Sequence, residues 1–156
     1  LEKVASILGL DSQTIRNLVP LVNRHGEGSV KNLRLEEEDG TWQLYAEYPF
    51  QKEAITFSGG SDGAQAMILL ELCVAMARFS SEFMPTILLL DGCVSLLDYE
   101  YISRYAEFLA SPEHHFQSIM MQVLKPAGKH ARRWAGWEFV RLIGTQRNVT
   151  IDQSPF

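Results

Sequence analysis

Apolar residues recur every three or four positions at the start of the chain and alternate with polar residues directly after it. The first spacing predicts helices within residues 1–24. The alternation that follows, over residues 30–36 and 41–48, predicts an antiparallel hairpin with one wet face, and Asp39-Gly40 is typical of the turn between its strands. The chain is therefore expected to open with helices and to continue into a sheet.

The rest of the chain combines apolar runs with further helical segments. Residues 64–80 are apolar almost all round, which predicts a helix buried against a sheet. Thr86-Ile-Leu-Leu-Leu-Asp91 is typical of a central parallel strand covered on both faces. A helix over residues 99–110, a strand over residues 116–123 and another over residues 137–143 follow. The predicted class is α/β, a mostly parallel sheet flanked by helices with an antiparallel hairpin near the N-terminus.

Length and composition allow one compact domain. The chain has 156 residues, a formal net charge of −5 and 21% charged residues, all ordinary for a globular protein. We interpret it as one unit, with a helical lead-in over residues 1–29 and an α/β lobe over residues 30–156. The acidic balance argues against nucleic-acid binding over the whole surface, although residues 125–137 are locally basic and contain Trp134 and Trp137.

The sequence shows neither an export signal nor a membrane span. Its longest apolar run, residues 67–77, is about half a bilayer span and carries Glu71 in its middle. Cys73 and Cys93 lack the spacing of a metal site, which favours the reducing environment of the cytoplasm. Because the chain begins at Leu1 without a basic segment or a cleavage-like site, we expect an internal or C-terminal piece of a larger protein.

Short motifs carry the candidate chemistry. Phe57-Ser58-Gly59-Gly60-Ser61 delivers two glycines into the start of the long helix, where backbone amides can face an anion. Asp91 ends the apolar strand, at the position where a carboxylate holds phosphate-bound magnesium in phosphoryl-transfer folds. Asp98 follows in Ser95-Leu-Leu-Asp98, directly before the next predicted helix.

The order and spacing of these motifs resemble the C-terminal lobe of an ABC-type ATPase head, in the branch that contains SMC and RecF-like proteins. Phe57 to Ser61 is similar to the signature motif Leu-Ser-Gly-Gly-Gln/Glu, Thr86 to Asp91 to the Walker B strand, and Ser95 to Asp98 to the D-loop. The resemblance covers residues 30–150.

In that family two heads share each ATP, and the resemblance implies roles for particular residues. Those implied in nucleotide binding in trans are consecutive: Ser58, Gly59, Gly60 and Ser61. Those implied elsewhere are Asp91 for Mg²⁺, Asp98 for coupling across the dimer and Gln122 for sensing the γ-phosphate. The implied partners are an N-terminal Walker A lobe of the same protein, a second head, DNA and an effector or accessory subunit.

Two departures from the family pattern change the expected chemistry. The sequence contains no Walker A loop, Gly-x-x-x-x-Gly-Lys-Ser/Thr, which implies that this loop lies in a preceding lobe. Gly92 stands where the family has its catalytic Glu, so hydrolysis should be slow or absent. We therefore expect a head that binds ATP as a clamp in a DNA-handling machine, serving DNA repair, chromosome organisation or anti-phage defence.

Two other classes of function stay open. Gly59-Gly60-Ser61-Asp62-Gly63 matches Gly-x-Ser-x-Gly, the nucleophile elbow of α/β-hydrolases, which predicts an esterase that uses Ser61. Asp91 then has the chain order of a catalytic triad with one of three histidines, His114, His115 or His130. The other class is a non-catalytic module that binds DNA or a protein through residues 125–137.

Overall fold

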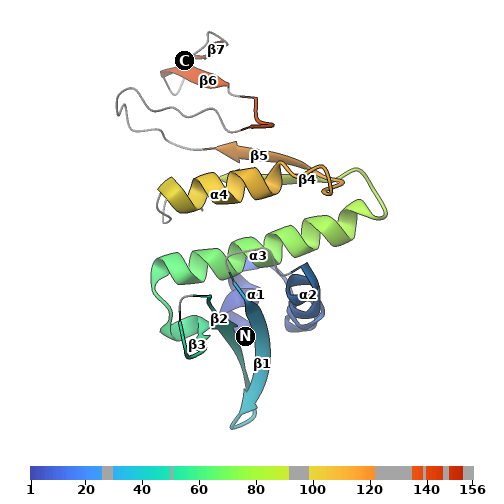
Figure 1. Ribbon diagram of the computed structural model, residues 1–156, viewed down its shortest axis with the longest axis vertical. Coiled ribbons are helices and arrows are strands. Elements are labelled where there is room, and N and C mark those ends of the chain that lie inside the picture. Colours follow the sequence, from blue (N-terminus) through green and yellow to red (C-terminus); the bar gives the residue numbers. More distant parts are fainter. Residues whose placement is uncertain are drawn as a thin grey trace.

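The computed structural model describes residues 1–25, 30–49, 51–91, 99–121, 135–138, 140–145 and 148–152, and Figure 1 shows their arrangement. The elements follow in the order α1 (Glu2–Leu8), α2 (Ser12–His25), β1 (Asn32–Glu38), β2 (Thr41–Glu47), β3 (Ile55–Thr56), the short 3₁₀ helix η1 (Phe57–Gly59), α3 (Asp62–Ser81), β4 (Ile87–Asp91), α4 (Tyr99–Leu109), β5 (Gln117–Met121), β6 (Arg141–Thr145) and β7 (Asn148–Asp152). Helices, antiparallel strands and one parallel pair confirm the predicted α/β class.

Local sequence chemistry sets the ends of α1 and α2. α1 ends at Gly9, whose φ of 65° is the left-handed conformation that glycine adopts easily after a helix. Asp11 precedes α2, and its carboxylate accepts hydrogen bonds from the Thr14 amide at 2.9 Å and the Thr14 hydroxyl at 2.7 Å. These bonds lower the pKa of Asp11. Pro20 lies inside α2, and the helix nevertheless continues to His25.

β1 and β2 form the predicted hairpin. Asp39 and Gly40 have φ of 49° and 74°, as a two-residue type I′ turn requires. At the edge of β1 that does not pair with β2, the Asn23 side chain donates to the Leu33 carbonyl and accepts from the Leu33 amide, both at 2.6 Å. This pair of bonds fastens α2 to the edge of the sheet. β3 pairs with the other side of β2 and leads directly into η1.

α3 separates two hydrophobic cores. Ile68 and Leu72 belong to the first core, with α1, α2 and the hairpin, whereas Leu70 and Val74 belong to the second, with β4, α4 and Phe116. Among the described residues, α3 is the one helix long and apolar enough to cross a membrane, and here both of its sides pack against protein. The prediction of a buried central helix is confirmed.

β4 and β5 form a parallel pair joined through α4, in the predicted β-α-β order. Leu88 and Leu90 face the second core, but the alternate positions are open: Ile87, Leu89, Ile119 and Met121 are 62%, 57%, 42% and 40% exposed. The prediction that the Thr86–Asp91 strand is covered on both faces is therefore wrong within this chain. α3 and α4 contribute to the core on one face of the pair, and nothing in the described chain buries the other face.

The last strands form a separate antiparallel pair, β6 with β7. The strand predicted over residues 137–143 overlaps β6 only from Arg141 onward, because residues 137 and 138 are not in a strand. Trp137 lies just before it and donates a hydrogen bond from its indole Nε1 to the Ala106 carbonyl of α4 at 2.8 Å. Trp137 also packs partly buried against the second core.

Candidate functional site

Two of the three motifs that the sequence singled out lie on the same side of the molecule. α3 and β4 run in opposite directions, so the N-terminus of α3 and the carboxyl end of β4 come to one edge, where α4 also begins (Figure 1). The loop from Phe57 to Ser61 precedes α3, and Asp91 ends β4. Ser58 and Asp91 are both exposed there. We call this side the motif edge.

The loop has a defined shape. Phe57 is 3% exposed and anchors it in the first core, while Ser58 and Gly59 face solvent. Thr56 caps η1: its Oγ1 accepts from the Gly59 amide at 3.0 Å, and its carbonyl accepts from the Gly60 amide at 3.1 Å. Both glycine amides therefore donate within the chain, and each would have to exchange its acceptor in order to bind an anion.

Lack of space explains the glycines at positions 59 and 60. A Cβ on Gly59 would lie 2.8 Å from Thr56 Oγ1, and one on Gly60 would lie 3.2 Å from the Ala64 Cβ. Gly60 has a φ of −74°, which any residue can adopt. The glycines thus let the backbone pass close to Thr56 and to the first turn of α3.

Ser61 is the N-cap of α3. It has φ −61° and ψ 164°, and its Oγ accepts a hydrogen bond from the Ala64 amide at 3.3 Å. Helix geometry leaves the Asp62 and Gly63 amides without an acceptor inside α3, and the dipole gives this end partial positive charge. The motif edge therefore offers donors suited to an anion, with the Ser58 hydroxyl close by in the chain.

The esterase arrangement does not form with the histidines that the structure places beyond α4. His114 accepts a hydrogen bond at Nδ1 from Nε of Arg78, at 3.3 Å. Arg78 lies in the last turn of α3, and a rise of about 1.5 Å per residue puts it roughly 25 Å from Ser61. His114 and its neighbour His115 are therefore too far away to activate Ser61. His130 lies outside the described residues.

Several residues singled out in the sequence cannot be placed. Gly92, Asp98 and Gln122 lie outside the described residues, as does the basic segment from Lys125 to Trp134. The roles expected for Asp98 and Gln122 stay predictions. Trp137 can be placed, and its hydrogen bond to α4 gives it a structural role instead of an exposed stacking surface.

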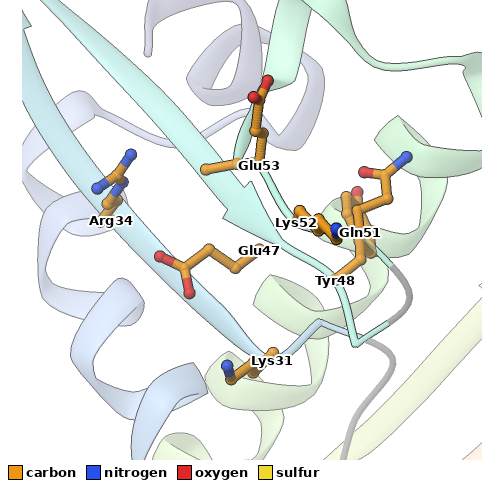
Figure 2. A pocket seen from close by; sticks show the side chains of 8 residues that line it. Lys31, Arg34, Glu47, Tyr48, Gln51, Lys52 and Glu53 are labelled. Carbon is orange, nitrogen blue, oxygen red and sulfur yellow. The ribbon is translucent and has the colours of Figure 1, made fainter.

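A pocket that the sequence did not indicate lies on the hairpin, with a volume of about 490 Å³ (Figure 2). Cations and carboxylates share its wall, and Glu47 lies between Arg34 and Lys31 in the view shown. This balance gives the pocket no clear preference for an anion. Tyr48, also in the wall, donates to the Ala64 carbonyl of α3 at 3.1 Å, and burial raises its pKa to about 12.

Solved structures share this fold. One belongs to work on ATP-driven dimerization and DNA-stimulated activation of SMC ATPases: it is 17% identical with a TM-score of 0.62, and the match covers 89% of this chain and 81% of that chain. The chain has the fold of an SMC ATPase head fragment. A second structure, an SMC head bound to the C-winged helix domain of ScpA, is 18% identical with a TM-score of 0.58.

The second match covers 89% of this chain but only 41% of that chain, so the present sequence spans less than half of the chain that it matches. Comparison of the sequence with protein-family models and with curated proteins finds no match. The structural likeness confirms the head fold that the three motifs indicated, and at these identities it establishes the fold alone.

Proposed function

We propose that this chain is the C-terminal half of an SMC-like ATPase head, which engages a second head around ATP and Mg²⁺. The observation that carries the proposal is the placement of the Ser58–Gly60 loop and Asp91 at one edge of a head fold. In this proposal Ser58, the glycine amides and Ser61 contact a nucleotide held by the partner head, and Asp91 binds Mg²⁺. Oxygen ligands of this kind suit a hard cation.

A preceding lobe of the same protein is the partner that the open sheet supports. The outer face of β4 and β5 presents Leu89 and Ile119 side by side, at a register position where strands of a parallel sheet are normally buried on both faces. The sequence also lacks a phosphate loop of its own. An N-terminal lobe that carries this loop and covers the outer face would supply both missing parts.

We propose that such a head acts more as a clamp than as a rapid hydrolase, because Gly92 cannot orient the attacking water as a carboxylate does. A cytoplasmic DNA-handling machine is the proposed setting, in DNA repair, chromosome organisation or anti-phage defence. The SMC ATPases of the first similar structure are described as activated by DNA, which supports DNA as a partner.

The test is whether the full-length protein dimerises when ATP and Mg²⁺ are added, with light scattering as the measurement of its mass. Ser58→Arg should abolish dimerisation, because Ser58 is exposed and a long cation there would separate the two surfaces. The control is Ser80→Arg, a half-buried position at the far end of α3, where an added cation suits the helix dipole and dimerisation should persist. Gly92→Glu should raise ATP turnover by about a hundredfold, as gain of a general base does.

Absence of any ATP response in the wild-type protein would refute the proposal. Ester hydrolysis that Ser61→Ala abolishes, with no effect of ATP, would instead support the hydrolase alternative.

A further inference from the structure

Two side chains, Lys3 and Gln65, contact the loop from Phe57 to Ser61 from outside it. Gln65, in the first turns of α3, donates from Nε2 to the Gly60 carbonyl at 2.9 Å. Its Oε1 accepts from Lys3 Nζ of α1 at 3.2 Å. The same ammonium lies 5.6 Å from the centre of the Phe57 ring. Lys3 thus reaches both ends of the Ser58–Gly59 segment, directly at Phe57 and through Gln65 at Gly60.

The arrangement determines the orientation of the Gln65 amide. Its oxygen faces a cation and its nitrogen faces a carbonyl, so a flipped amide would lose both hydrogen bonds. α1 delivers Lys3 from a fixed position, because its neighbours Val4 and Ala5 are 0% and 6% exposed in the first core. A rigid element, a side-chain amide and the loop are therefore connected in series.

We infer that Lys3 and Gln65 are positioning residues for nucleotide engagement: they hold the Ser58–Gly60 loop in the shape that meets the second head. The inference rests on the proposed function, and neither residue needs to touch the nucleotide. The α1 helix thereby becomes part of the site, since a displacement of α1 would carry Lys3 away from both ends of the loop.

The experiment uses the full-length protein and two readouts. The first is hydrogen exchange of the Ser58–Gly60 amides without nucleotide, and the second is the ATP concentration that gives half-maximal dimerisation. Gln65→Ala should speed exchange in the loop and raise that concentration about fivefold, the effect of losing one ordinary hydrogen bond. Lys3→Ala should change both readouts in the same direction. Lys3→Arg should leave the exchange rate and the half-maximal ATP concentration at their wild-type values, because Arg keeps the donor and the cation over Phe57.

Gln13→Ala is the matched control, because Gln13 makes an exposed side-chain bond to Asn17 on α2 at 3.2 Å, away from the loop. It should change neither readout. Unchanged exchange and an unchanged half-maximal concentration in both Gln65→Ala and Lys3→Ala would overturn the inference.

The exchange measurement separates this inference from the proposed function. If the wild-type protein ignores ATP, the proposed function fails, and the nucleotide role of Lys3 and Gln65 fails with it. Faster exchange in Gln65→Ala would then still establish that the two side chains hold the loop, whereas equal exchange would refute that as well.

Discussion

Leu89 and Ile119 are neighbours across β4 and β5, and 57% and 42% of their surfaces stay exposed. Full burial of a large aliphatic side chain stabilises a protein by about 1.5–3 kcal/mol. Taken together, about one side chain's worth of this surface is exposed and about one is already buried within the chain. A lobe that covers the face would therefore double the buried apolar surface that the substitutions remove. We predict that Leu89→Ser with Ile119→Ser lowers the free energy of unfolding by about 3–6 kcal/mol if the face is covered, and by about half of that if it is not.

Urea unfolding of the full-length protein, followed by fluorescence, measures this loss. A direct check is the rate at which maleimide modifies Leu89→Cys in the native protein, identified by peptide mass spectrometry. Ile7→Cys serves as the reference, because Ile7 on α1 is 52% exposed and Leu89 is 57% exposed, so the two positions are about equally accessible in this chain. A covered face predicts modification at least about tenfold slower at position 89, the protection expected from local opening. Equal rates at the two positions would refute the covering lobe.

Two further predictions concern α3 and its neighbours. Ser61→Ala should cost about 1 kcal/mol of stability by removing the N-cap, and Ser61→Asp should restore it; equal urea midpoints for all three proteins would contradict the capping role. Stability should fall above about pH 10, because burial raises the pKa of Tyr48 to about 12 and the fold favours its neutral phenol. Tyr48→Phe should flatten that decline in urea titrations between pH 8 and about 11, and an unchanged slope would contradict this assignment.

The elements set by local chemistry could be predicted from the sequence. Gly9 ends a helix because the next turn needs a left-handed residue, and Asp39-Gly40 makes a hairpin because both positions have positive φ. The continuous apolar character of residues 64–80 matched a helix with a core on each side. The order and spacing of the Phe57–Ser61 loop and Asp91 indicated the head fold. The structure adds that the two lie at one edge, because α3 and β4 run in opposite directions.

Features that depend on contacts between distant segments could not be predicted. The apolar run before Asp91 indicated burial on both faces, but a sequence pattern does not say whether the same chain supplies the covering layer. Lys3 and Gln65 are 62 positions apart and carry ordinary surface side chains, so no local signal joins them. The Gly-x-Ser-x-Gly match suggested a catalytic triad, but neither His114 nor His115 lies near Ser61. Three fixed residues in a sequence do not specify where the rest of a triad lies.

Engagement of the Gly59 and Gly60 amides inside the loop is compatible with an anion-binding role. The acceptors are the hydroxyl and the carbonyl of Thr56 and, for the Gly60 amide, also the Phe57 carbonyl at 3.3 Å, all of them neutral groups. A net hydrogen bond between neutral partners contributes about 1 kcal/mol, whereas one to a charged group contributes about 1.5–3 kcal/mol. A phosphate oxygen can therefore displace Thr56 with a gain in free energy. Meanwhile Thr56, together with the bonds through Gln65, keeps the loop ordered before any ligand arrives, which lowers the entropic cost of binding.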